Sequence, residues 1–192
     1  MSDRFEQAIA RFDAANAEDP HHEIVDGDEV PKELIYGKRM SEALADFAPE
    51  ASEALRLAVR AQHLQRWKIP RSDYPMGRVG YLRWRKELKD LHAELAGAIL
   101  KDVGYDDDTV ERVGVLLRKK GLKTDPEVQL LEDVVCLVFL RFYLDAFAAD
   151  HEDSKVVDIL RKTWGKMSEA GRAAALRLDL GVSARLVEQA LA

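Results

Sequence analysis

A histidine flanked by arginines is the first feature of this sequence that could do chemistry. In the stretch EALRLAVRAQHLQRW, the residues Arg56, Arg60, His63 and Trp67 follow one another at i, i+4, i+7 and i+11. A helix over this stretch would place all four side chains on one face. Such a stripe packs poorly, but it suits an anion, or a metal ion that carries an anionic ligand. The alternative is a surface histidine among surface arginines.

A second histidine follows in GYLRWRKELKDLHAELAGAILKDVG. Here Tyr81, Arg85, Leu88 and His92 share one face of an expected helix. A lone His92 would be typical of a partly buried packing residue, but His63 on a neighbouring helix makes a shared site plausible. Two imidazoles and a carboxylate from separate helices form a site suited to Fe, Mn, Zn or Ni.

The carboxylate for such a site comes from LLEDVVCLVFL, an otherwise apolar stretch that contains Glu132 and Asp133. A buried carboxylate is costly unless it is paired or bound to a metal. Adjacent helical residues point about 100° apart, so only one of the two can face the site. We predict that His63, His92 and Asp133 bind one divalent metal ion (Mn, Fe, Ni or Zn). A buried ion pair with an arginine is the alternative for the acid.

The charges are distributed unevenly along the chain. Its 29 Lys and Arg against 35 Asp and Glu give a net charge of −6, yet residues 60–89 are strongly basic. A basic segment in an acidic protein attracts an anion locally without broad affinity for nucleic acid. Solvated or internally paired charges are the alternative. The residues that we expect to bind an anion are Arg60, Arg66, Arg83, Arg85 and Lys119.

The elements that position these residues are all predicted to be helices, because no stretch alternates with period two and Gly and Pro lie at segment ends. We expect six to nine helices and no sheet, with residues 17–30 and 68–80 as loops. The expected helices cover residues up to 15, then 31–47, 50–67, 80–103, 106–121 and 125–149, with two or three shorter ones after 153. Residues 125–149 are the most apolar and should be central.

Composition excludes several classes of protein. One cysteine rules out an internal disulfide framework and a cysteine-built zinc site. The longest apolar stretch, 134–140, is too short to span a bilayer, and the first residues lack the apolar core of a signal peptide. No glycine-rich phosphate loop is present, so we expect no nucleotide cofactor. We therefore expect a cytoplasmic protein with no membrane partner.

Part of the chain resembles the metal-dependent HD-domain phosphohydrolases, an all-helical superfamily. The similar segments, LAVRAQHLQRW, LHAELAGAIL and LLEDVVCL, lie within residues 34–140. The resemblance implies that His63 corresponds to the histidine of the His-Asp doublet, with Leu64 in place of its aspartate. It places Tyr36 at the first histidine and Asp133 near the late aspartate, and it adds Tyr36 to the expected substrate contacts. The length of 192 residues predicts one helical domain, 1–192, and the resemblance implies an HD-like core at about 34–149 with a helical extension at about 153–192.

A closer resemblance is to the uncharacterised family called domain of unknown function 4202. The segments FDAANAEDP, ELIYGKRM, RAQHLQRW, IPRSDYPMGRVGYLRWR, LEDVVCLVFL and ILRKTWGKMS carry it over nearly the whole chain. Some members are labelled glutamyl-tRNA synthetase. This small, all-helical chain has no sign of a nucleotide-binding fold to support that activity.

Three functions follow from these observations. The first is a metal-dependent hydrolase or lyase that acts on a small phosphorylated or anionic substrate through a metal-bound water. The second is a non-catalytic module that binds a phosphate-bearing ligand, or RNA through aromatic and basic side chains of residues 60–89, with the small ligand favoured. The third is a helical protein that binds a partner, and a homo-oligomer is left open in each case.

Overall fold

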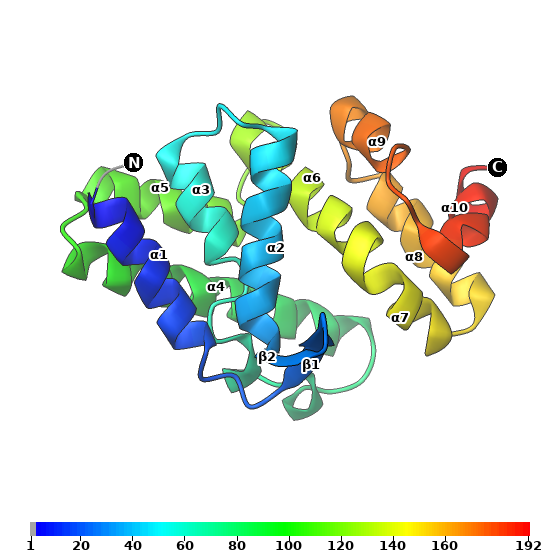
Figure 1. Ribbon diagram of the computed structural model, residues 1–192, viewed down its shortest axis with the longest axis horizontal. Coiled ribbons are helices and arrows are strands. Elements are labelled where there is room, and N and C mark those ends of the chain that lie inside the picture. Colours follow the sequence, from blue (N-terminus) through cyan, green and yellow to red (C-terminus); the bar gives the residue numbers. More distant parts are fainter. Residues whose placement is uncertain (1–2) are drawn as a thin grey trace.

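The computed structural model describes residues 3–192 and confirms the all-helical fold class. Ten α-helices and one β-hairpin make up this part of the chain (Figure 1). The helices are α1 (Asp3–Asn16), α2 (Lys32–Phe47), α3 (Glu53–Arg60), α4 (Arg78–Asp102), α5 (Asp107–Arg118), α6 (Pro126–Val138), α7 (Leu144–Ala149), α8 (Asp153–Trp164), α9 (Glu169–Ala175) and α10 (Ala184–Leu191). The strands are β1 (His22–Val25) and β2 (Asp28–Pro31). None of these helices is long and apolar enough to cross a membrane.

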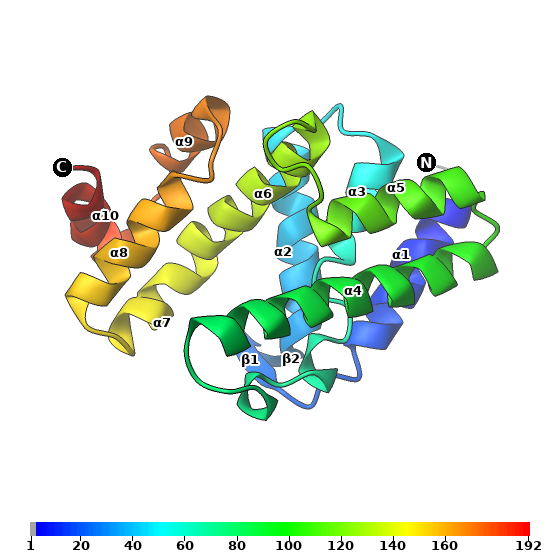
Figure 2. The same cartoon turned by 180° about the vertical axis from the view of Figure 1, so that it is seen from behind.

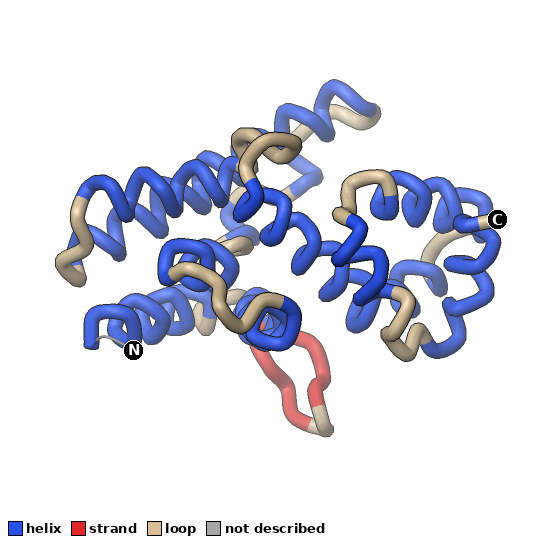
Figure 3. Tube along the Cα trace, turned by 90° about the horizontal axis from the view of Figure 1, so that it is seen from above, coloured by secondary structure: helices blue, strands red, loops and turns tan. Residues whose placement is uncertain are grey.

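The hairpin corrects the prediction of a plain loop over residues 17–30. Strands β1 and β2 pair antiparallel, with Val25 opposite Asp28. The turn residues Asp26 and Gly27 have φ of 53° and 93°, the two positive values that a two-residue type I′ turn requires. The Asp-Gly dipeptide after Ile24-Val25 is the local signal for this hairpin. Seen from above, the hairpin projects away from the helices (Figure 3).

The third helix is shorter than predicted. Helix α3 ends at Arg60 rather than near Trp67, and the chain continues through turns to a short 3₁₀ helix, Arg66–Lys68. Gln65 adopts a left-handed conformation with φ of 50°, and its N–H donates to Asn16 Oδ1 at 2.8 Å. The predicted single helical face of Arg56, Arg60, His63 and Trp67 therefore does not exist.

The helix predicted over residues 125–149 is divided, which raises the count to ten. A π-helical turn, Phe139–Tyr143, separates α6 from α7. Asp125 caps α6 by accepting from the N–H groups of Glu127 and Val128, and Pro126 occupies the first turn. The apolar sequence of α6 is buried on most sides, as expected for a central helix.

Two apolar clusters fill the molecule. The first is formed by side chains of α1 to α6 and includes Phe12, Met40, Leu57 and Leu131. The second lies between the C-terminal half of α6, α7 and α8 to α10. Figures 1 and 2 show α6 and α7 running between the N-terminal helices and the group formed by α8, α9 and α10. Side chains from α6 contribute to both clusters, so this helix joins the two parts of the fold.

Candidate functional site

The largest concentration of predicted site residues lines one cavity of about 430 Å³, which we call the cationic pocket. Its walls come from the start of α2, the turn after α3, the first half of α4, and the segment from α6 to just beyond α8. The lining residues are Lys32, Glu33, Tyr36, His63, Arg66, Tyr81, Arg85, Glu132, Val135, Cys136, Phe139, Tyr143, Phe147, Ile159, Thr163 and Lys166.

Glu33 is positioned at this pocket by contacts with the segment before the hairpin. Its backbone N–H donates to Asp19 Oδ2 at 3.0 Å, and its carbonyl accepts from Asn16 Nδ2 at 3.2 Å. Asp19 and Asn16 are both buried, so they hold the first turn of α2 from within the protein. The Glu33 side chain is thereby directed at His63.

His63 is held from two sides. Its Nδ1 lies 3.0 Å from Glu33 Oε2, and its ring stacks on Tyr36 with centroids 3.8 Å apart and planes within 9°. The early end of α3 causes this arrangement, because the following turns direct the ring towards α2 instead of along the helix. The structure thus brings His63 and Tyr36 together, as the predicted site requires.

Burial disfavours the charged forms of both Glu33 and His63. Burial raises the pKa of Glu33 to about 7, although Arg66 acts to lower it. Burial also lowers the pKa of His63 well below its usual value, and Arg66 and Arg85 act in the same direction. At neutral pH the imidazole is uncharged and the carboxyl group is partly protonated.

His92 lies next to His63, as predicted. The two rings are 5.9 Å apart between centroids. Neither ring nitrogen of His92 has a hydrogen-bond partner among the described residues, and the side chain is buried. Burial, followed by the nearby His63, lowers its pKa well below the usual value. His92 is therefore a neutral ring behind the pocket wall.

Asp133 faces away from the two histidines. It is fully buried and accepts from Ser168 N at 2.8 Å, Ser168 Oγ at 2.6 Å and Gln129 Nε2 at 3.1 Å. Gly171 packs against it so closely that an added Cβ would lie 2.6 Å from Asp133 Oδ1. These contacts hold the start of α9 against α6, so Asp133 has a structural role in joining the two helices.

Glu132, not Asp133, is the acid of α6 that faces the pocket. It pairs with Lys119, and its Oε1 lies 3.8 Å from Lys166 Nζ. Burial acts to raise the pKa of Glu132, but Lys119 and Lys166 together hold it below the usual value. The alternative interpretation of a buried ion pair thus applies to Glu132, with lysines in place of arginine. Within residues 3–192, no group of three or more His, Cys, Asp or Glu side chains is arranged to hold a metal ion.

The predicted anion-binding residues separate into two groups. Arg66 and Arg85 line the cationic pocket, and Lys119 lies behind it with its amine committed to Glu132. Arg60 instead forms a bidentate pair with Asp13, and Arg83 is exposed and pairs with Glu87 at 2.8 Å. Neither Arg60 nor Arg83 lines the pocket.

Sequence reasoning missed Lys32, Glu33, Lys166 and the aromatic wall. Glu33 and Tyr36 are spaced i, i+3 in the segment ELIY, a signal that could have placed the acid beside Tyr36. Phe139 and Tyr143 come from the π-helical turn, and such turns are frequent at functional sites. Lys166 follows α8, and nothing local marks it.

Comparison with known proteins gives one match, to a protein family. A family model described as domain of unknown function (DUF4202) matches residues 6–187, nearly the whole chain. No curated protein and no solved structure matches the chain. The resemblance to HD-domain phosphohydrolases is not confirmed by these comparisons.

Proposed function

This chain belongs to the family described as domain of unknown function (DUF4202), and we propose that it binds a small phosphorylated or similarly anionic molecule in the cationic pocket. The observation that carries the proposal concerns Lys32 and Arg85. Both line the pocket, and neither forms an ion pair with any residue of 3–192. Cations that converge on a cavity without counter-charges favour an anionic ligand.

The overall charge of the pocket lining supports the same ligand class. Four cations line it (Lys32, Arg66, Arg85 and Lys166) against two carboxyl groups (Glu33 and Glu132). Glu132 is already compensated by Lys119 from behind the wall, and Glu33 is partly protonated near neutral pH. The lining therefore carries excess positive charge that a phosphate dianion would offset.

The apolar lining residues suit the organic part of such a molecule. Phe139, Tyr143 and Phe147 supply aromatic surface, and Val135 and Ile159 add aliphatic surface. A volume of about 430 Å³ is within the range of small-molecule sites. A phosphate attached to a compact apolar or planar group fits this combination of cationic and apolar lining residues.

A second candidate function is hydrolysis of the bound molecule. It is favoured by His63, whose Nδ1 is held by Glu33 while the ring lines the pocket. An imidazole held in this way can exchange a proton with a ligand through its other nitrogen. The metal ion expected at His63, His92 and Asp133 stays a prediction, and no step here depends on it, because Asp133 is directed elsewhere. Elemental analysis of protein purified without chelator would test it.

The binding proposal is tested by calorimetric titration with inorganic phosphate, pyrophosphate and phenyl phosphate. We expect Arg85→Gln to weaken binding of the tightest probe by roughly tenfold to a hundredfold, the worth of one charge-assisted hydrogen bond. Arg83→Gln is the matched control, since Arg83 lies on the same helix but outside the pocket. It should leave the affinity unchanged.

Two results would contradict the proposal. One is that none of the three probes binds the unmodified protein. The other is that Arg85→Gln and Arg83→Gln weaken binding equally, which would indicate a diffuse electrostatic effect. Release of inorganic phosphate from phenyl phosphate, lost in His63→Ala, would favour the hydrolytic candidate over binding alone.

A further inference from the structure

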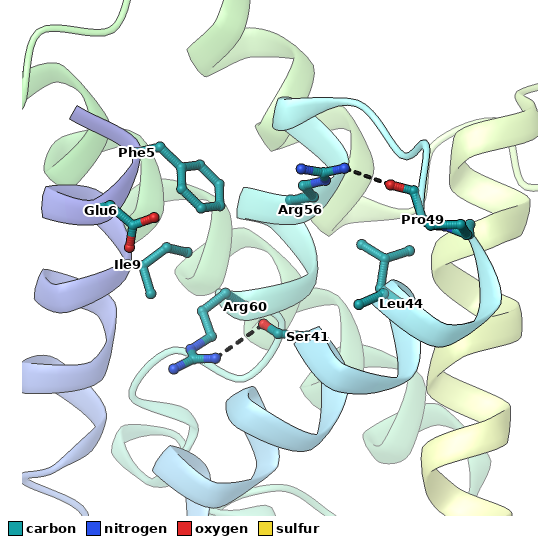
Figure 4. Close-up of a pocket in the computed structure, with 10 residues that line it drawn as sticks. Phe5, Glu6, Ile9, Ser41, Leu44, Pro49, Arg56 and Arg60 are labelled. Atoms are coloured by element: carbon teal, nitrogen blue, oxygen red, sulfur yellow. Dashed lines mark hydrogen bonds between the residues drawn. The ribbon is translucent and has the colours of Figure 1, made fainter. Parts of the chain in front are cut away.

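A second cavity, of about 370 Å³, is lined by residues of α1, α2 and α3. We call it the α1–α3 groove, and Figure 4 shows its lining. The residues that form it are Phe5, Glu6, Ile9, Ser41, Leu44, Ala45, Ala48, Pro49, Arg56 and Arg60. It contains the two arginines of the predicted histidine stripe that the cationic pocket leaves out.

Most of the groove surface is apolar. Phe5 and Ile9 of α1 face Leu44 of α2 across it (Figure 4). Ala45 and Ala48, whose side chains are short, also line it. Leu44 is only 2% exposed, so the floor of the groove is continuous with the core. A concave apolar surface of this size with a few polar groups is typical of a ligand site.

The two arginines of the groove differ in what they already bind. Arg60 donates from Nε and from one terminal nitrogen to Asp13, at 2.7 and 2.6 Å, and from the other to Ser41 Oγ. Arg56 donates to the carbonyl of Pro49 at 2.6 Å and forms no ion pair among the described residues (Figure 4). Arg56 is thus the one guanidinium of the groove without a counter-ion in residues 3–192.

We propose that the α1–α3 groove binds a small amphipathic carboxylate, with its apolar chain against Phe5, Ile9 and Leu44 and its carboxylate on Arg56. A planar guanidinium with free N–H groups matches a carboxylate in a bidentate geometry. A singly charged ligand is favoured over a phosphate dianion, because Arg56 is a single uncompensated cation and Glu6 lies on the opposite wall. The site is independent of the cationic pocket and shares no lining residue with it.

The test is a titration of the full chain with octanoate, in which two-dimensional NMR spectra report binding. Octanol is the uncharged ligand of matched length. We expect Arg56→Met to weaken octanoate binding at least tenfold and to leave octanol binding unchanged. Arg11→Met, a change of the same kind on exposed α1 surface outside the groove, should have no effect. Ala45→Trp fills the groove from an exposed position and should abolish binding of both ligands.

Octanoate could also be attracted to the cationic pocket, so Arg85→Gln is included. Under the present proposal Arg85→Gln leaves octanoate binding intact while it weakens phosphate binding. The proposal is overturned if octanoate does not bind, if Arg56→Met and Ala45→Trp both leave its affinity unchanged, or if only Arg85→Gln weakens it. Thermal melting of each variant establishes that a loss of binding is not a loss of folding.

Discussion

At the scale of single residues, the carboxyl group of Glu33 contacts two side chains of the cationic pocket. It hydrogen-bonds His63, lies 3.5 Å from Arg66 Nε, and its helix also carries the Tyr36 ring on which His63 stacks. Its side chain is only 8% exposed. Because burial raises its pKa from 4.5 to about 7, the folded protein holds a proton that the unfolded chain releases at lower pH.

This shift predicts a dependence of stability on pH. The folded state favours protonated Glu33, so the free energy of unfolding should fall as pH rises from about 4.5 to about 7, by about 3 kcal/mol at most. In Glu33→Gln the group cannot ionise, so this part of the decrease should be absent. Urea denaturation at mildly acidic and mildly alkaline pH measures it.

The control for this prediction is Glu29→Gln, which alters an exposed carboxyl group of the hairpin. It should show the same pH dependence as the unmodified protein. A Glu33→Gln variant with an unchanged pH dependence would mean that Glu33 ionises in the folded state as it does in the unfolded chain.

Two neighbouring acids in α6 have different surroundings because adjacent helical residues point about 100° apart. Glu132 faces the cationic pocket and neutralises Lys119, whereas Asp133 faces α9 and accepts from Ser168 and Gln129. The two residues have nearly the same local sequence and the same charge. Only the neighbours that each one contacts give them separate roles.

At the scale of secondary-structure elements, the start of α4 controls where Arg85 and Tyr81 lie. Gly77, with φ of 90°, precedes the helix, and Gly80 packs against the preceding loop. A Cβ on Gly80 would lie 2.0 Å from the carbonyl oxygen of Pro75, which is backbone and cannot move away alone. The loop and the first turn of α4 can therefore approach each other only at a glycine.

Gly80→Ala should displace this first turn. We expect a loss of about 1–3 kcal/mol in the free energy of unfolding, the usual cost of overpacking, together with weaker binding of pyrophosphate, because Arg85 moves. Chemical denaturation and calorimetry measure the two effects.

Gly97→Ala is the matched control on the same helix. Its added Cβ meets only the end of the Val110 side chain, at 3.3 Å, and the site is far along α4 from Arg85. It should leave pyrophosphate affinity unchanged. If Gly80→Ala also left both stability and affinity unchanged, the close packing of the loop on α4 would not determine the position of Arg85.

At the scale of the whole molecule, the cationic pocket is lined from both apolar clusters. Lys32, Glu33 and His63 belong to the N-terminal part, while Phe147, Ile159 and Thr163 belong to the part around α7 and α8. A ligand in this pocket contacts both parts at once. The ligand therefore binds, and stabilises, only the folded state in which the two parts are packed together.

Pyrophosphate should therefore raise the melting temperature. At a concentration about one hundred times its Kd, pyrophosphate should add about 2.7 kcal/mol to the free energy of unfolding. For a chain of this size, that increase raises the melting temperature by roughly 5–10 °C. Differential scanning calorimetry measures the shift. In Arg85→Gln at the same concentration the shift should shrink, and in Arg83→Gln it should persist. An equal shift with sulfate at the same ionic strength would contradict specific binding of the phosphate.

The helices and most of their limits were determined by the sequence itself, because helix formation depends on contacts three and four residues apart. The apolar periodicity, Asp125-Pro126 and the flanking glycines mark α4, α5 and the start of α6 closely, but not the end of α6. Family membership was equally evident, since the motifs extend over nearly the whole chain. His63 and His92 also lie close together, with ring centroids 5.9 Å apart, as a shared site requires, while their binding of a metal ion stays a prediction.

The composition of the site was decided by the tertiary structure. Helix α3 ends at Arg60, and in the turns that follow the N–H of Gln65 donates to Asn16, far away in the chain. His63 then faces Glu33, thirty residues before it. The same fold sends Arg56 and Arg60 to a separate groove and directs Asp133 towards α9. Each of these outcomes depends on packing between segments that are distant in sequence, and local residue spacing carries no information about which segments meet.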